Sequence, residues 1–300
     1  KRYFYGDDGA MLFKNQFLGG SWYWFDMNEG FMWTGSANIY GRWYRYDLSD
    51  GHMLTGSQYI DGHWYWYDLT AGMMLTGSQY IDGHWYWYDL TAGIMLTGSQ
   101  YIDGDWYWYD LTAGMMLTGS QNIYGNWYWY DLVDGRMLFG WQDIYGTMTY
   151  YDKKDGIRLF ESNHLYQDWK KANGMSSPTK YLILVDTGGC YTSVFKGSRN
   201  DWTPLYDWRC SPGAAATPTP KGYYSIKGRG YSFGHGYTCY YWTQFYGDYL
   251  FHTILYYPNT FIPMEGTMGV PASQGCVRLE YDNAKWLNQN IPNRTTVYIY

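Results

Sequence analysis

The chain has 300 residues, a formal net charge of -6 and a pI near 5.4, a length that is enough for two domains of ordinary size. No run of Lys or Arg stands out, so we expect no nucleic-acid partner and no attraction to an anionic membrane surface. No apolar stretch approaches the roughly 18 residues of a spanning helix, so we also expect no membrane span.

The first residues, KRYFYGDDGAML, lack the apolar core of a signal peptide. They are similar to the second half of a repeat found downstream, so we expect the chain to be a piece of a longer protein. Aromatic residues make up 23% of the chain, and thirteen of the 18 Trp lie before residue 160. All four Cys lie after it. The composition therefore predicts two different parts.

The first part is a repeat array with a period of 21 residues. Two signals recur at this step: a T-G pair at Thr34, Thr55, Thr76, Thr97 and Thr118, and a Trp at Trp22, Trp43, Trp64, Trp85, Trp106 and Trp127. One further step reaches MTYYD, a decayed copy of WYWYD. We therefore assign residues 1–158 to the array.

Each repeat predicts one β-hairpin. Asp61 and Gly62 separate two strand-like runs, and this pair favours a type I′ turn because both central positions need a positive φ. Within HWYWYD, alternation places Trp64 and Trp66 on one face and the intervening Tyr residues on the other. A lone hairpin is marginal in water, so the repeats must stack into a solenoid.

Two interpretations of the aromatic residues remain open. They can be the core of a thin solenoid, or they can expose ring faces that stack on sugars or hold a quaternary ammonium group. The candidate ligand-binding residues of the array are Trp64, Trp66, Trp85, Trp87, Trp106, Trp108, Trp127, Trp129 and Trp141.

The repeat resembles the cell-wall-binding repeat of choline-binding and glucan-binding proteins from Gram-positive bacteria, which has a G-W…G-x-W-Y-Y-F-D…G-x-M-x-T-G pattern. The G-W of that family becomes G-S at Ser36, Ser57, Ser78, Ser99 and Ser120, and only Gly140 and Trp141 keep it. That Trp is one wall of the choline cage of the family. The resemblance therefore implies that the partner is a cell-wall glycan or another wall polymer rather than choline.

The pattern changes after residue 158, and we assign residues 159–178 to a linker. Within it HLYQDWKKA favours a short helix that ends near Asn173 and Gly174. Residues 179–300 then predict a β-rich domain, with strands at YLILVD, YTSVFKG, PLYDWRC and TTVYIY. DNAKWLNQN predicts a helix with Asp282 as its N-cap. The fold class is mainly β, with one or two short helices.

Cys276, in the segment PASQGCVRLEYD, is the candidate nucleophile. A nucleophilic thiol needs a base to take its proton, and the second part offers His164, His235 and His252. His252 lies in an apolar strand, where a hydrogen-bonded core residue is the other interpretation. Arg278 offers a fork that suits a carboxylate. From the residues alone, a nucleophile, a disulfide and an inert thiol all remain open.

The segment SQGCVRL, residues 273–279, resembles the [ST]-H-G-C-x-[RN] signature of L,D-transpeptidases, which cross-link peptidoglycan. CSPGAAATPTPKGYYSI, YLFHT and DNAKW resemble further segments of that family in the same order. The second part is therefore identified as a member, with the β-rich catalytic domain of the family. The resemblance implies Cys276 as nucleophile, His252 as general base, a Thr253 carbonyl that orients it, an oxyanion hole at Gly275 and Cys276, and a substrate-binding role for Arg278, Ser273 and Gln274.

The implied reaction is a two-step acyl transfer on peptidoglycan stem peptides. Cys276 attacks the carbonyl of the diamino acid at the third stem position and expels the terminal D-alanine. An acceptor amine then resolves the thioester to a 3→3 cross-link, or water resolves it as in an L,D-carboxypeptidase. The resemblance implies no metal and no organic cofactor, and a secreted, wall-attached protein.

Two departures from the family pattern leave an alternative open. Gln274 replaces the signature histidine, and it cannot carry a proton in turnover. The spacing from His252 to Cys276 is long, so we expect YYPNTFIPMEGTMG to be a loop beside the site that shapes substrate choice. The alternative is a non-catalytic wall-binding protein that only retains stem peptides.

The pairing of the other three cysteines is open. We expect a disulfide between Cys210 and Cys239, which an extracellular location permits. Cys190 and Cys210 as cross-strand neighbours, or a pair that includes Cys276, are the other possibilities.

Overall fold

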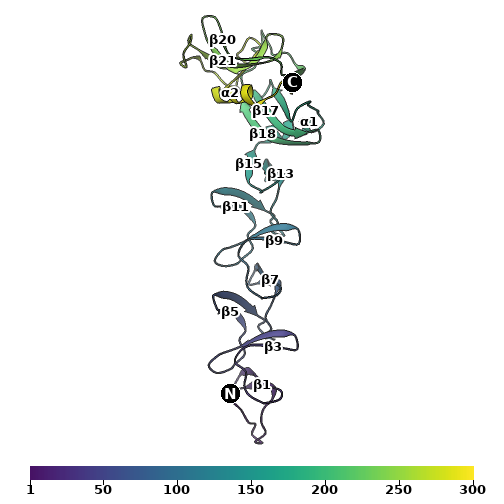
Figure 1. The fold of residues 1–300 in the computed structure, drawn as a ribbon, viewed down its shortest axis with the longest axis vertical. Coiled ribbons are helices and arrows are strands. Elements are labelled where there is room, and N and C mark those ends of the chain that lie inside the picture. The colour runs from purple at the N-terminus through teal and green to yellow at the C-terminus, as the bar shows by residue number, and fades with distance from the viewer. The chain divides into compact units, whose positions relative to one another are not determined.

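The computed structural model describes residues 1–300, and the chain divides into two compact units. The first comprises Lys1–Gln142 and Tyr150–Leu159, and the second comprises Asp143–Thr149 and Phe160–Tyr300. The prediction of a mainly β chain is confirmed, because the only helices are α1 (Asn163–Asn173) and α2 (Tyr281–Asn290) (Figure 1). Neither is long enough to cross a membrane.

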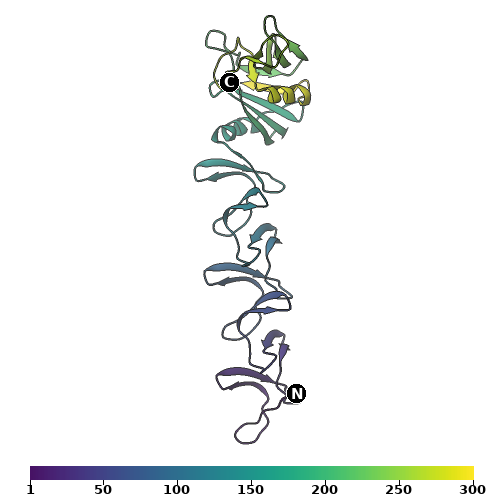
Figure 2. The same cartoon turned by 90° about the vertical axis from the view of Figure 1, so that its left-hand side faces the viewer.

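The first unit is a series of two-stranded hairpins, and Figure 2 shows successive hairpins facing different directions. The pairs are β1 (Lys14–Leu18) with β2 (Ser21–Phe25), β3 (Gly35–Ile39) with β4 (Arg42–Tyr46), β5 (Gly56–Ile60) with β6 (His63–Tyr67), β7 (Gly77–Ile81) with β8 (His84–Tyr88), β9 (Gly98–Ile102) with β10 (Asp105–Tyr109), and β11 (Gly119–Ile123) with β12 (Asn126–Tyr130). The last sheet has three strands, β13 (Gly140–Ile144), β14 (Thr147–Tyr151) and β15 (Arg158–Glu161).

The hairpin turns have the geometry that the sequence predicts. Asp61 has a φ of 51° and Gly62 a φ of 88°, which are the two positive values of a type I′ turn. The strands pair antiparallel in register, with Tyr59 opposite Trp64 and Gln58 opposite Tyr65. The turn therefore sets which aromatic rings face each other across the hairpin.

Backbone hydrogen bonds join each repeat to the one before it. The N–H of Met74 donates to the carbonyl of Trp43 over 2.8 Å, and the N–H of Met95 donates to Trp64 over the same distance. The methionine of each repeat also packs against a glycine farther along the chain. For example, a Cβ on Gly72 would come within 2.4 Å of the Met53 sulfur. The period of 21 residues is therefore a packing requirement as well as a sequence pattern.

The second unit contains two main sheets and one small one. The five-stranded sheet has the order β18-β17-β16-β26-β19, and the four-stranded sheet has the order β20-β21-β22-β25. The strands are β16 (Tyr181–Asp186), β17 (Tyr191–Ser198), β18 (Asp201–Arg209), β19 (Gly222–Ser225), β20 (Arg229–Phe233), β21 (Cys239–Tyr246), β22 (Tyr249–Thr253), β25 (Val277–Leu279) and β26 (Thr296–Ile299), with β23 (Leu255–Tyr256) and β24 (Pro263–Glu265) as a separate pair.

One apolar core holds these elements together. It combines Ile183 and Val194 of the five-stranded sheet with Phe251 and Val277 of the four-stranded sheet. Leu287 of α2 belongs to the same core and is fully buried. Burial of a large apolar side chain stabilises a fold by roughly 1.5–3 kcal/mol. Strands β22 and β25 are therefore anchored to the core through Phe251 and Val277.

Most of the segment expected to be a linker, residues 159–178, belongs to the second unit. The helix α1 runs over Asn163–Asn173 and ends at Gly174, as predicted. Its Trp169 donates through Nε1 to the Trp202 carbonyl over 2.6 Å, and Trp202 donates through Nε1 to the Met175 carbonyl. These bonds tie the segment to β18. Trp202 is buried and Trp169 is half-buried, and an indole N–H removed from water needs a hydrogen-bond partner.

The second helix begins two residues earlier than the sequence predicts. Glu280 is the N-cap of α2, and its side chain makes no capping hydrogen bond. Asp282, the expected N-cap, lies in the first turn. A carboxylate there still stabilises the helix through its dipole, which explains why the sequence signal was displaced by two residues.

Candidate active site

The candidate site lies where β22 and β25 run parallel. Phe251 pairs with Val277, and His252 pairs with Arg278. Because side chains alternate along a strand, Cys276 and Arg278 point to the same face, beside His252. These three side chains line a cavity of about 160 Å³ together with Phe233, Tyr237, Cys239, Leu255, Ser273 and Gln274. The fold thus gathers the predicted cysteine, histidine and arginine in one place.

His252 is held as a neutral imidazole. Its Nδ1 donates to the carbonyl of Thr253 over 2.6 Å, which leaves Nε2 as the acceptor. The side chain is only 4% exposed. Burial, with a smaller contribution from the charge of Arg278, lowers the pKa of His252 to about 4, although the Thr253 hydrogen bond opposes the shift. The imidazole is therefore uncharged at neutral pH.

Cys276 is the one cysteine that is not fully buried. Burial raises the pKa of its thiol, while the backbone N–H of Leu250 and the charge of Arg278 favour the thiolate. Its Sγ lies 3.7 Å from the carbonyl oxygen of Asp248. The two side chains are therefore a neutral thiol and a neutral imidazole.

The expected disulfide between Cys210 and Cys239 is absent, because all four cysteines are free thiols. Cys210 follows β18, and its N–H donates to the Cys190 carbonyl, so these two are neighbours as the alternative pairing supposed. Cys239 begins β21 in the other sheet and lines the cavity. Burial raises the pKa of both Cys210 and Cys239 to about 12, which makes them poor nucleophiles.

Ser273 shapes the loop before Cys276. Its hydroxyl donates to the Cys276 carbonyl over 2.6 Å and accepts from the Gly275 N–H over 3.0 Å. The hydroxyl is thus occupied by backbone groups, and its expected contact with substrate stays a prediction. The Gly275 N–H is likewise occupied, and the oxyanion hole expected at Gly275 and Cys276 stays a prediction. Gln274 is exposed at the cavity.

Gly275 is required by its conformation and by its surroundings. Its φ is 108°, a value that residues with a side chain rarely adopt. A Cβ at this position would lie 2.5 Å from Cε1 of Tyr249. The glycine therefore allows the loop to pass close to β22, which brings Cys276 to the cavity that His252 lines.

Glu265, which no sequence motif singled out, pairs with Arg278. Its Oε2 lies 2.5 Å from Nη1 of Arg278. Glu265 ends β24, and β24 pairs with β23, the short strand that follows the His252 strand. Glu265 is the only acidic residue of YYPNTFIPMEGTMG, the segment expected to form a loop beside the site. That single carboxylate was the available signal.

The other two histidines of the second unit do not line this cavity. His164 lies on α1 among three carboxylates, with Nε2 3.3 Å from Asp186 and 3.6 Å from Asp168, and Nδ1 3.6 Å from Asp207. His235 lies in an exposed loop. His252 is therefore the histidine of the second unit that lines the cavity together with Cys276.

The array contains two equivalent cavities, three repeats apart. The first, of about 350 Å³, is lined by Trp43, Arg45, Asp61, Tyr65 and Tyr67 among others. The second, of about 310 Å³, has Trp106, Trp108, Tyr124, Tyr128 and Tyr130 at the same repeat positions. The second cavity is therefore the more aromatic, since a Trp and a Tyr replace an arginine and an aspartate.

The predicted ligand-binding tryptophans fall into two classes. The first of each pair is the more exposed: Trp64, Trp85, Trp106 and Trp127 are 40–42% exposed. Trp66, Trp87, Trp108 and Trp129 are half-buried. The last tyrosine of each strand, such as Tyr67, is about 3% exposed and belongs to the core. Trp141 packs against Tyr150 at a ring distance of 5.2 Å. Core and accessible rings thus coexist in each repeat.

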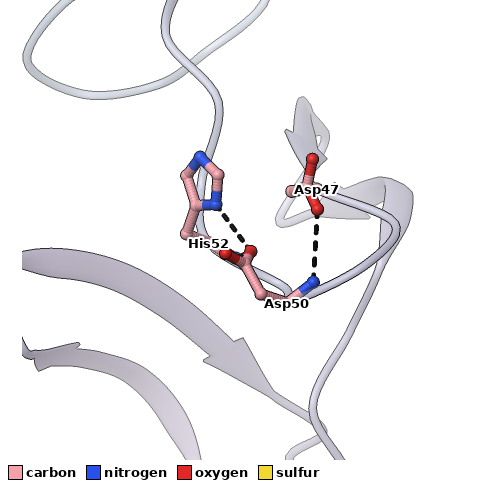
Figure 3. Close-up of side chains that lie close together, drawn as sticks. All are labelled: Asp47, Asp50 and His52. Carbon is pink, nitrogen blue, oxygen red and sulfur yellow. Dashed lines mark hydrogen bonds and ion pairs between the residues drawn. The ribbon is translucent and has the colours of Figure 1, made fainter.

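One group of potential metal ligands lies in the array, at the turn after β4 (Figure 3). The Asp47 carboxylate accepts from the backbone N–H groups of Ser49 and Asp50. The Asp50 carboxylate accepts from the backbone N–H of His52 and contacts its Nδ1. These carboxylates already satisfy the turn, so the hydrogen bonds explain the cluster without a metal.

Known proteins match both parts of the chain. Residues 180–299 match the L,D-transpeptidase catalytic domain, and residues 33–76 and 75–118 match the choline-binding repeat. One relative is YciB of Bacillus subtilis (strain 168), which is named as an L,D-transpeptidase candidate. It is 38% identical over 147 residues, and the match covers 44% of this chain and 74% of YciB. The chain belongs to the L,D-transpeptidase family.

Among solved structures, CbpJ from Streptococcus pneumoniae TIGR4 is 27% identical, with a TM-score of 0.50. The match covers 52% of this chain and 56% of CbpJ. The chain therefore spans about half the length of that solved structure. The predicted combination of a wall-binding repeat with an L,D-transpeptidase domain is confirmed by these matches.

Proposed function

We propose that this chain is a secreted, wall-attached L,D-transpeptidase that forms 3→3 cross-links through a thioester on Cys276. The observation that carries the proposal is the shared cavity of Cys276 and His252, with a neutral imidazole whose Nε2 can accept a proton. A neutral base and a neutral thiol suit general-base catalysis of the attack.

In the first step, Sγ of Cys276 bonds to the carbonyl carbon of the third stem residue while Nε2 of His252 takes the thiol proton. The Cys276 N–H stabilises the oxyanion. Collapse breaks the peptide bond, and the proton leaves with the amine of D-alanine. In the second step, an acceptor amine attacks the thioester and restores the thiol. Thr253 acts as the positioning residue, through its carbonyl contact with Nδ1.

The repeats are proposed to hold the enzyme at a wall glycan or another wall polymer. The support is the match to the choline-binding repeat and the aromatic cavity around Trp108 and Tyr124. Ring faces of this kind stack on the apolar faces of sugars. The proposed division of labour is residues 1–158 for attachment and residues 179–300 for catalysis.

The test is intact-protein mass spectrometry after incubation with a stem tetrapeptide, on wild type, Cys276→Ala and Cys210→Ala. The proposal expects an acyl adduct on wild type and Cys210→Ala and none on Cys276→Ala. Product analysis with an acceptor peptide then separates a 3→3 transpeptidase from an L,D-carboxypeptidase. No adduct on any of the three proteins contradicts the proposal.

The second candidate is a non-catalytic protein that binds stem peptides without acylation. Gln274 at the cavity favours it, because the family signature has a histidine there. Peptide binding by wild type without any covalent adduct would select this candidate.

A further inference from the structure

Arg278 carries the only permanent charge among the side chains that line the active-site cavity. Its backbone is fixed on the far side by two 2.9 Å hydrogen bonds with Ser211, one in each direction. The side chain is 9% exposed, and its Nε is buried without a hydrogen-bond partner. A buried guanidinium with an unused donor is poised to receive an anionic group.

Glu265 already supplies one carboxylate to this guanidinium. It reaches Nη1 of Arg278 from outside the cavity wall, since Glu265 is not among the lining residues. Its position is set by pairing with Leu255, which does line the cavity, and by the nearby bond from Ser211 Oγ to the Thr267 carbonyl. The Glu265 side chain is 40% exposed, so solvent can take it up if it leaves Arg278.

We propose that Glu265 is a specificity-determining residue whose carboxylate competes with the C-terminal carboxylate of the donor peptide for Arg278. This inference rests on the proposed function for the identity of the donor. In the free protein Glu265 neutralises Arg278, so the carboxylate of an incoming donor competes with it for the same charge. Exchange of one carboxylate for another keeps the buried guanidinium paired throughout, which avoids an unpaired buried charge.

The competition has a definite direction. If Glu265 only held the Arg278 side chain in position, its substitution would weaken donor binding. A competing carboxylate does the opposite: its removal strengthens the binding of donors that end in a carboxylate. Donors that end in an amide have no charge for Arg278 to recognise, so their affinity stays the same.

The test measures donor binding rather than turnover, by calorimetry on the full chain in a Cys276→Ala background. Cys276→Ala is compared with Cys276→Ala/Glu265→Gln, using the stem tetrapeptide and its C-terminal amide. The inference expects the Kd of the tetrapeptide to fall by about threefold to tenfold, the size of a partly exposed charge interaction. The Kd of the amide stays unchanged.

Two further variants control the measurement. Glu280→Gln removes an exposed acidic side chain near β25 that does not pair with Arg278, and it should leave both Kd values unchanged. Glu265→Asp keeps the charge on a shorter side chain and should give a tetrapeptide Kd between the other two, which keeps the test decisive if Glu265→Gln folds poorly.

A tetrapeptide Kd that rises or stays the same in Glu265→Gln would overturn the inference, as would an equal change for the amide, or no binding of either peptide. Acylation of Cys276 is measured separately in wild type. Acylation without the Kd pattern rejects the role of Glu265 alone, and the Kd pattern without acylation rejects the proposed catalysis alone.

Discussion

His252 and Arg278 lie directly opposite each other on the parallel strands β22 and β25. This register places a permanent positive charge next to the proposed base and inside the same buried cavity. Burial and this charge both disfavour the imidazolium, so His252 stays neutral over most of the accessible pH range.

The acylation rate should persist well below the pH at which an ordinary histidine becomes protonated. Because the pKa of His252 is lowered to about 4, the base remains available at pH 5 and is lost only as the pH falls toward 4. The measurement is the rate of adduct formation on Cys276 between pH 4 and 8. A rate that falls along a titration centred near 6.5 would contradict this assignment of the base.

Protein stability should also carry the signature of His252. Its folded pKa lies below the unfolded value, so between about pH 6.5 and 4 the unfolded state binds more protons. Stability is therefore full above 6.5 and declines as the pH falls through this window, by on the order of 3 kcal/mol. Urea unfolding of wild type and His252→Gln checks this: the decline should be smaller in the variant. Equal declines in wild type and His252→Gln would show that His252 does not bind a proton more readily in the unfolded state than in the folded state.

Gly275→Ala should remove acylation. The substitution places a Cβ 2.5 Å from Tyr249 and forces a side chain onto a φ of 108°. The strain alone is about 1–3 kcal/mol, and relief of the clash moves Cys276 away from His252. Adduct formation should fall at least tenfold, and Gly275→Ala/Tyr249→Leu should recover part of it. Recovery to the wild-type rate would show that the conformation of the glycine itself is unimportant.

The array offers a matched pair of glycine substitutions. Gly93→Ala places a Cβ 2.5 Å from the Met74 sulfur, while Gly83→Ala at a hairpin turn meets nothing within 4 Å. Both have a positive φ, so both lose roughly 1 kcal/mol from strain. Only Gly93→Ala adds overpacking, about 1–3 kcal/mol more. Urea unfolding should rank the two in this order, and equal losses would mean that the methionine contact is soft.

The two array cavities should differ in affinity for the wall polymer. Trp108→Arg gives the second cavity the residue of the first and should weaken binding of purified cell walls about twofold to tenfold, the value of one aromatic contact. The reciprocal Arg45→Trp should strengthen it. Both proteins should fold, because each side chain already occurs at this repeat position. Unchanged binding in both would assign these rings to the solenoid core.

Much of the fold could be predicted because its signals are local. The type I′ turn at Asp61 and Gly62 depends on two φ values that the residues themselves favour, and the strand Tyr181–Asp186 is a continuous apolar run. Helix α1 ends at Gly174 for an equally local reason. The start of α2 was misplaced by two residues, because an acidic residue stabilises both the cap and the first turn.

The sequence by itself determined the repeat period, the family and the candidate nucleophile and base. Each of these depends on a short motif of consecutive residues. Only the tertiary structure decided which cysteine is accessible, that Cys210 and Cys239 are both free thiols, and that Glu265 pairs with Arg278. The reason is physical: burial, pKa and ion pairing depend on which strands become neighbours, and the parallel pairing of β22 with β25 joins residues that are far apart along the chain.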